Sequence, residues 1–284
     1  MKYLIKIVLM ILFFGVGLFA KDVASVVGLR GDAFLQRDMQ KIEVSLGLKL
    51  QEKDTVFTGN DAKVQIIFED ETIITLGKNS KFSIDEYLFE DKQKPVAKFA
   101  MLKGAMRTIT GRIGKIAPEK FSVTTKTATI GIRGTNFTVV YGENDSENVY
   151  CTYGSISVVV QGVEYVVQQG FYIHIENTKA EVKEFSAKEL KDMKSKSFGS
   201  SKLNSMNGRD LDIDGLLDIR PDADVDIVIK DISDQVQDGV QNKVPEEEIH
   251  HEDHQQPAQG SGGSQSPAQG SGGSQPPTGG SQPY

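Results

Sequence analysis

The sequence predicts an all-β fold in which many short strands build a stacked roll-like, solenoid-like or jelly-roll-like module. Between residues 21 and 178, runs rich in β-branched and aromatic residues recur about every 8 to 12 residues, with turn signals between them. Apolar and polar residues alternate in VQIIF at residues 64–68, which indicates a strand with one face in the core and the other in solvent. Helical periodicity is absent from this region. The rhythm of short strand, glycine and short strand leaves the choice among these architectures open.

Turn residues between the apolar runs define the expected strands. These strands cover residues 24–27, 33–36, 54–57, 63–68, 72–76, 81–88, 96–102, 105–109, 121–124, 136–140, 148–152, 155–160, 164–168 and 171–175. A module of this length, about 155 residues, is large enough to bury a core of its own.

The first twenty residues are predicted to be a secretory signal peptide. Lys2 and Lys6 precede an apolar run that ends at Ala20, and its length of about 14 residues is short for a membrane-spanning helix. We expect cleavage after Ala20 and export to the periplasm or the cell surface. An uncleaved run would instead anchor the chain in the inner membrane. Cys151 is the only cysteine, so we expect a buried, unreactive thiol and no internal disulfide.

An Arg-Gly-Thr sequence lies between two strand-forming runs in FSVTTKTATIGIRGTNFTVV, residues 121–140. Glycine inside a strand usually marks a bulge, a bend or a close approach of another backbone. We therefore expect a local distortion of the sheet that aims Arg133, whose donors would hold carbonyls or a carboxylate. The expected motif is structural rather than catalytic, and its residues are Gly131, Arg133, Gly134, Thr135 and Phe137.

Five segments in order resemble the FecR domain, a periplasmic β module associated with iron-citrate signalling. They are VVGLRGDAFLQR, LGLKLQEKDTVFTGNDAKVQIIFEDETIITLGKNSKFSI, LKGAMRTITG, the Arg-Gly-Thr segment and VYCTYGSISV. The resemblance implies an envelope protein. Signalling members of the family carry a cytoplasmic anti-sigma segment before a spanning helix, whereas only a few residues precede the first apolar run here. We therefore expect a module without the anti-sigma function.

Composition changes sharply after residue 178. Residues 21–178 carry a net charge of −1, and residues 179–284 carry a net charge of −8. We expect a signal peptide at 1–20, a FecR-like β domain at 21–178, a helical linker at 179–206, an Asp-rich segment at 207–244 and a disordered tail at 245–284. In the linker, Ser186 and Glu189 have the spacing of a capping box and predict a helix over residues 187–197.

The Asp-rich segment contains DLDIDGLLD, which resembles half of a calcium-binding loop. Asp210, Asp212, Asp214 and Asp218 occupy the first, third, fifth and ninth positions of such a loop, and Gly215 occupies the turn. Position twelve is Pro221, which supplies no carboxylate. Two interpretations stay open, a weak calcium site and an acidic linker.

The tail combines an acidic, histidine-containing stretch with a low-complexity repeat. His250, His251 and His254 lie among five acidic residues, a combination that suits a weak transition-metal site or a solvated charge run. The repeat PAQGSGGSQ lacks the apolar residues that would offset the entropy of ordering. We therefore expect a flexible tail that gives the domain reach.

Three functions are compatible with these observations. We favour a non-enzymatic binding module of the cell envelope, with an envelope protein or a glycan as its partner and no cofactor except calcium. The first alternative is a membrane-anchored sensor that signals with an outer-membrane TonB-dependent transporter. The second is a calcium-dependent surface or adhesion protein. An enzyme is not expected because no nucleophile, acid and base cluster in the sequence, and an acidic exported chain does not suit nucleic acid.

Overall fold

The computed structural model describes residues 21–89, 94–142, 145–199, 202–205 and 210–212. Contacts divide the chain into two units, residues 1–244 and 245–284, and all of the described residues lie in the first. Within the described ranges, no helix combines the length and the hydropathy that crossing a membrane requires.

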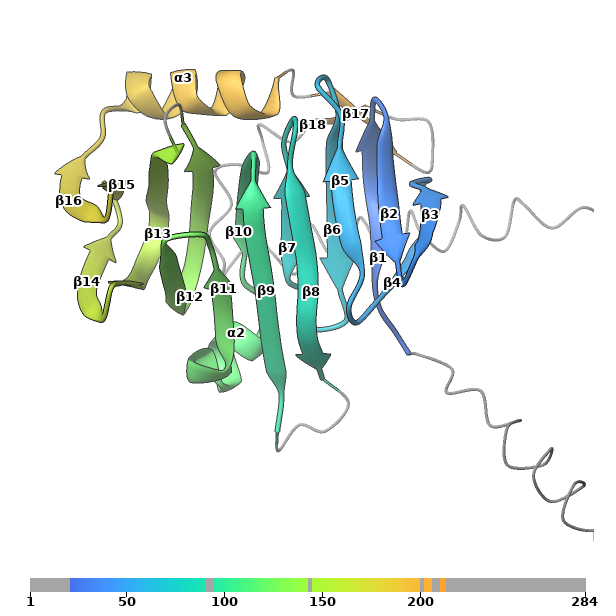
Figure 1. The fold of residues 1–284 in the computed structure, drawn as a ribbon, viewed down its shortest axis with the longest axis horizontal. Coiled ribbons are helices and arrows are strands. Elements are labelled where there is room, and N and C mark those ends of the chain that lie inside the picture. Colours follow the sequence, from blue (N-terminus) through green and yellow to red (C-terminus); the bar gives the residue numbers. More distant parts are fainter. Residues whose placement is uncertain (1–20, 90–93, 143–144, 200–201, 206–209, 213–284) are drawn as a thin grey trace, which may run out of the picture. The chain divides into compact units, whose positions relative to one another are not determined.

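Strands dominate this unit, which confirms the all-β prediction (Figure 1). They are β1 (Asp22–Arg30), β2 (Ala33–Arg37), β3 (Gln40–Glu43), β4 (Lys49–Gln51), β5 (Thr55–Thr58), β6 (Lys63–Phe68), β7 (Ile73–Leu76), β8 (Lys81–Leu88), β9 (Val96–Lys103), β10 (Ala105–Ile109), β11 (Phe121–Thr124), β12 (Ala128–Tyr141), β13 (Glu147–Val160), β14 (Val163–Gln168), β15 (Phe171–Glu176), β16 (Lys179–Glu184), β17 (Lys202–Ser205) and β18 (Asp210–Asp212). The helices are α2 (Arg112–Ile116), the 3₁₀ helix η1 (Pro118–Lys120) and α3 (Ala187–Phe198).

The strands form one continuous sheet that folds back on itself into two layers, which we call the first and the second sheet and which share β12 and β13. The first sheet has the order β17, β1, β6, β7, β10, β12, β13, β15, β16. The second has the order β3, β2, β5, β8, β9, β11, β12, β13, β14. All of these neighbours are antiparallel except β9 and β11, which run parallel. The short strand β4 pairs with the start of β1, and β18 pairs with β17.

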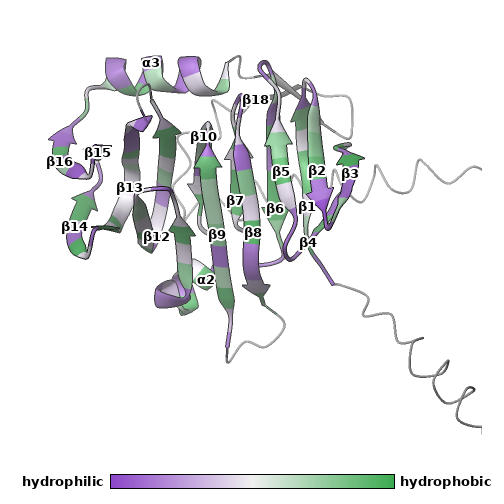
Figure 2. Cartoon of the chain, in the orientation of Figure 1, coloured by the Kyte–Doolittle hydropathy of each residue, from purple (hydrophilic) through white to green (hydrophobic). Residues whose placement is uncertain are grey.

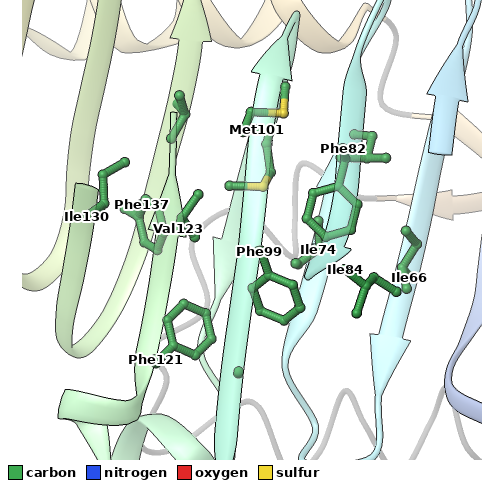
Figure 3. Packing of buried hydrophobic residues seen from close by; sticks show 14 of the residues in the cluster. Ile66, Ile74, Phe82, Ile84, Phe99, Met101, Phe121, Val123, Ile130 and Phe137 are labelled. Atoms are coloured by element: carbon green, nitrogen blue, oxygen red, sulfur yellow. The ribbon is translucent and has the colours of Figure 1, made fainter. Parts of the chain in front are cut away.

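The hydrophobic core lies between the two sheets. Phe68 of β6 in the first sheet contacts Phe99 of β9 in the second, with ring centroids 5.0 Å apart. Phe99 also contacts Phe82 of β8 at 5.6 Å and Phe121 of β11 at 5.5 Å. Figure 3 shows Phe82, Phe99 and Phe121 in this packing. Because burial of one such side chain contributes about 1.5 to 3 kcal/mol, these rings are a main cause of the sheets' association.

The helix α3 confirms the prediction made from the capping box and extends one residue further than expected. The Ser186 Oγ accepts a hydrogen bond from the Glu189 N–H at 3.2 Å, and the Glu189 Oε2 accepts one from the Ser186 N–H at 2.7 Å. The helix is largely hydrophilic (Figure 2), with Met193 buried beneath it. Its last turn is tied to the first sheet because the Lys78 N–H donates to the Ser197 carbonyl oxygen at 3.2 Å.

Several strands differ from the prediction made from the sequence. Residues 148–152 and 155–160 form one continuous strand, β13, and residues 136–140 are only the second half of β12. The strands β3, β4, β16, β17 and β18 were not expected. β3 and β4 have four and three residues, and β16 has the charged sequence KAEVKE. Pairing with neighbouring strands therefore outweighs their weak local preference for a strand.

Candidate functional site

The Arg-Gly-Thr motif lies where β12 passes from the second sheet to the first. Before the motif, Gly131 pairs with Ser122 of β11, and after it, Asn136 pairs with Ile109 of β10. Pairing with β13 continues through the motif but shifts register between Arg133 and Asn136. The sequence signal for a distorted sheet thus corresponds to a corner at which one strand serves two sheets.

Two glycines allow β12 and β13 to pass each other at this corner. Gly134 has φ +63° and Gly154 has φ +74°, in the left-handed region that side chains disfavour. A Cβ atom on Gly154 would also collide with the Gly134 carbonyl oxygen. Gly131 differs, because its φ is not positive and the nearest atoms to an added Cβ are 3.9 Å away. Only the second glycine of the motif is therefore required by its backbone.

Two buried threonines fasten the corner to the end of β10. The Thr135 N–H donates to the Thr110 Oγ1 at 2.9 Å, and the Thr110 N–H and Oγ1 both donate to the Thr135 carbonyl oxygen at 3.1 Å. Thr135 is 0% exposed and Thr110 is 2% exposed. These three hydrogen bonds hold the backbone of the motif in a site without solvent.

The other residues of the expected motif have separate positions. Phe137 is fully buried in the core, where it pairs with Thr108 and Cys151 across the neighbouring strands. The side chain of Arg133 is exposed, and no hydrogen bond or ion pair joins it to any residue that the structure describes. The fastening contacts at this corner thus come from threonines, and Arg133 presents its charge to solvent.

Cys151 is buried and has the character of an unreactive thiol. Its Sγ lies 3.4 Å from the Tyr153 carbonyl oxygen, to which the S–H donates. Burial raises the pKa of the Cys151 thiol to about 11. Because the thiolate is the reactive form of cysteine, this environment disfavours nucleophilic chemistry.

A buried carboxylate that the sequence analysis missed organises the turn between β6 and β7. The side chain of Asp70, 0% exposed, accepts hydrogen bonds from the Thr72 N–H and Oγ1, the Tyr87 hydroxyl and the Ile113 N–H. Burial, followed by the charge of Asp70, raises the pKa of Tyr87 above its ordinary value. Both oxygens of the carboxylate are occupied by protein donors, so this cluster connects β8 and α2 to the turn.

The last strand of the second sheet presents apolar side chains to solvent. Among the described strands, β14 pairs only with β13, and its other edge is open. Val163 is 54% exposed and Val166 is 63% exposed. The matching edge of the first sheet, β16, carries Lys179, Glu181 and Lys183. Charged side chains protect a sheet edge from further pairing, so β14 is the less protected of the two edges.

The proposed metal ligands fall largely beyond the described residues. Asp210 and Asp212 belong to β18, where their backbones pair with Asn204 and Lys202 of β17. The remaining residues of both expected sites lie outside the described ranges, and these are Asp214, Asp218, His250, His251 and His254. Within the described residues, no three His, Cys, Asp or Glu side chains are grouped in a way that would hold a metal ion. The calcium site stays a prediction.

Part of the chain matches a known protein family. Residues 54–157 match the family model described as FecR protein. No curated protein matches the chain. Two crystal structures of "a putative anti-sigma factor from Parabacteroides distasonis ATCC 8503" are similar to it, each with a TM-score of 0.40 and with 18% and 19% sequence identity. They cover 49% and 48% of this chain. The chain spans only 63% and 62% of theirs, less than two thirds.

The matched segment runs from the turn before β5 into β13 and contains the corner at which β12 changes sheets. This match places a FecR domain at residues 54–157 of the chain.

Proposed function

We propose that the protein is a non-enzymatic binding module of the bacterial cell envelope, and that its contact surface is the open edge of β14. The observation that carries this proposal is the exposure of Val163 and Val166 on a strand that is paired along one edge only. The family match supports an envelope protein without naming its partner.

The chemistry of β14 favours an extended peptide segment of an envelope protein as the partner. An open strand edge offers a row of backbone N–H and C=O groups, to which another strand can pair. The acidic side chain of β14, Glu164, accepts a hydrogen bond from the Ser157 Oγ at 2.5 Å and so lies against its own sheet. Val166 remains available for apolar contact with an added strand.

Site-specific cross-linking in cells tests this surface. A photo-reactive amino acid at Val166 of the full chain should capture an envelope protein. The same amino acid at Met39, which is 99% exposed in the turn between β2 and β3, serves as the control. Adducts that are absent at position 166, or that are the same at both positions, would contradict the proposal. Capture at position 166 that Val166→Lys weakens in a separate pull-down would support it.

The family match also favours a second candidate, a regulator that receives a signal from an outer-membrane TonB-dependent transporter. This function requires a connection to the cytoplasm, so residues 1–20 would have to stay attached. Mass spectrometry of the N-terminus of the native protein distinguishes the two. A chain that begins near Lys21 favours the released module, and an intact Met1 favours the anchored regulator.

A further inference from the structure

A row of aromatic and basic side chains crosses the second sheet on the side away from the core. Val56 of β5 and Phe82 of β8 belong to the core between the sheets. Because side chains alternate along a strand, their neighbours Phe57 and Lys81 point to the opposite side, which we call the outer face of the second sheet. Phe34 of β2 pairs with Phe57, and Phe57 pairs with Lys81. The three side chains therefore form one row across β2, β5 and β8, which lie side by side in Figure 1.

The two phenyl rings of this row are stacked, and an ammonium group lies over each of them. The ring centroids of Phe34 and Phe57 are 4.6 Å apart, and the ring planes differ by 7°. The Lys41 Nζ lies 4.2 Å from the Phe34 centroid, and the Lys81 Nζ lies 5.3 Å from the Phe57 centroid. Attraction to the ring keeps each ammonium group near its phenyl face. The row thus presents two cations at defined positions, which lowers the entropy cost of binding a ligand.

A third lysine brings two like charges together on the same row. Lys103 of β9 pairs with Lys81 of β8, so both side chains leave the sheet on its outer face. Like charges at directly opposed positions destabilise a strand pair. Within the ranges that the structure describes, no ion pair joins Lys41, Lys81 or Lys103 to an acidic side chain. An anion bound to this face would offset the repulsion between Lys81 and Lys103.

Two acids lie near the row without pairing with its lysines. Glu43 of β3 pairs with Phe34, so β2 and β5 separate it from Lys81. Asp85 of β8 accepts a hydrogen bond from the Ser83 Oγ at 2.7 Å. The charge at the β8 and β9 end of the row therefore stays positive.

We propose that the outer face of the second sheet binds an anionic polysaccharide of the cell envelope, whose acidic groups pair with the three lysines of the row. A line of uncharged polar side chains runs beside the row, because Gln36 pairs with Thr55 and Thr55 pairs with Ser83. All three are partly or fully exposed. Amide and hydroxyl groups can exchange hydrogen bonds with sugar hydroxyls, so the two lines together suit an acidic sugar chain. This surface is separate from the open edge of β14.

The geometry of the face favours an anionic glycan over a peptide or a neutral sugar. Backbone N–H and C=O groups pair with neighbouring strands in the plane of the sheet, so an extended peptide would gain no main-chain hydrogen bonds on this face. A neutral sugar would depend on contact with aromatic rings. Phe34 and Phe57 already contact each other and the two ammonium groups. Recognition therefore depends on the charge of the lysines.

Titration of the full chain with soluble polysaccharides at low salt tests the proposal. Polygalacturonate, which carries a carboxylate on each sugar, should bind, and neutral dextran should not. Lys81→Gln together with Lys103→Gln should weaken binding about tenfold. Lys188→Gln together with Lys191→Gln removes the same charge from exposed positions of α3 and should weaken binding less than about twofold. The variant at Lys81 and Lys103 should melt no lower than the unchanged protein, because it loses a like-charge contact.

Four results would overturn the proposal. The unchanged protein could fail to bind polygalacturonate, or the two double variants could lose affinity equally, which would mean that net charge alone matters. A lower melting temperature of the variant at Lys81 and Lys103 would show that the fold already stabilises these charges without an anion. Poly-L-glutamate that displaces polygalacturonate at an equal concentration of carboxylates would assign the face to an acidic protein segment.

Discussion

At the scale of single residues, Gly134 and Gly154 decide whether β12 and β13 can serve two sheets. Sequence reasoning located the distortion because glycine in a strand-forming run is conspicuous, but it assigned the fastening to Arg133. The structure places the hydrogen bonds on Thr110 and Thr135. A contact between residues 25 positions apart depends on strand pairing, which no local pattern in the sequence encodes.

Substitution of glycines at the corner should show which of them the backbone conformation requires. Gly154→Ala should destabilise the protein by about 1 to 3 kcal/mol, because it forces a side chain into the left-handed region and against a carbonyl oxygen. Gly131→Ala is the control, and it should be neutral or stabilise by about 0.4 to 1 kcal/mol. Thermal unfolding measures both. Equal losses at the two positions would contradict the distinction.

The buried carboxyl group of Glu147 gives a residue-scale dependence on pH. Glu147 is 0% exposed, its Oε2 accepts a hydrogen bond from the Thr127 Oγ1 at 2.7 Å, and its Oε1 has no partner among the described residues. Burial raises the pKa of Glu147 above its ordinary value. Burial raises the pKa of the nearby Tyr141 to about 12, so its hydroxyl stays neutral between pH 4 and pH 7.

Because the folded protein binds this proton more tightly than the unfolded chain, ionised Glu147 lowers stability at neutral pH. That penalty disappears as the pH falls below the unfolded-state pKa of about 4.3. Glu147→Gln should therefore raise the melting temperature at pH 7, and its advantage should shrink at pH 4. Thermal unfolding of both proteins at the two pH values measures the difference. An equal change at both pH values would show that the charge is not the cause.

At the scale of elements, local sequence signals predicted the bounds of individual strands and the start of a helix. Four strands, β6, β8, β10 and β11, have the expected bounds, and the capping box marks the start of α3. The strand β16 was missed because its charged sequence gives no core signal, and it becomes a strand by pairing with β15. The division of strands between two sheets could not be predicted, because alternation shows only that a strand has a buried face.

The cap of α3 offers a test at this scale. Ser186→Ala removes the side chain that accepts the Glu189 N–H and should destabilise the helix by about 1 kcal/mol. Hydrogen exchange of the amides in α3 should then become about fivefold faster, as 1 kcal/mol implies. Ser195→Ala, at an exposed position in the same helix, should change exchange little. Unchanged exchange in Ser186→Ala would mean that tertiary contacts alone hold the helix.

At the scale of the whole molecule, composition and family resemblance predicted more than any single motif did. The FecR resemblance derived from five ordered segments is confirmed by the family match at residues 54–157. The segment-by-segment organisation of the chain, the signal peptide and the partner stay predictions. Cleavage of a signal peptide and binding of a partner both depend on other molecules, so the packing of this chain does not reveal them.

Calcium binding is also a question about the whole chain, because two of its proposed ligands, Asp210 and Asp212, lie on β18 and the others lie outside the described residues. Isothermal titration of the full chain should give calcium-dependent heat that Asp212→Ala with Asp214→Ala abolishes. Replacement of Asp61, an exposed acid outside the Asp-rich segment, by Ala should leave the heat unchanged. A flat trace for the unchanged protein would falsify the calcium prediction.

The sharing of β12 and β13 by both sheets has a mechanical consequence. A sandwich of two independent sheets can yield to force in stages, one sheet peeling from the other. Here each sheet loses its central pairing as soon as this long hairpin opens, because β10 and β11 are both hydrogen-bonded to β12. Pulled from its ends, the folded unit should therefore rupture in a single step.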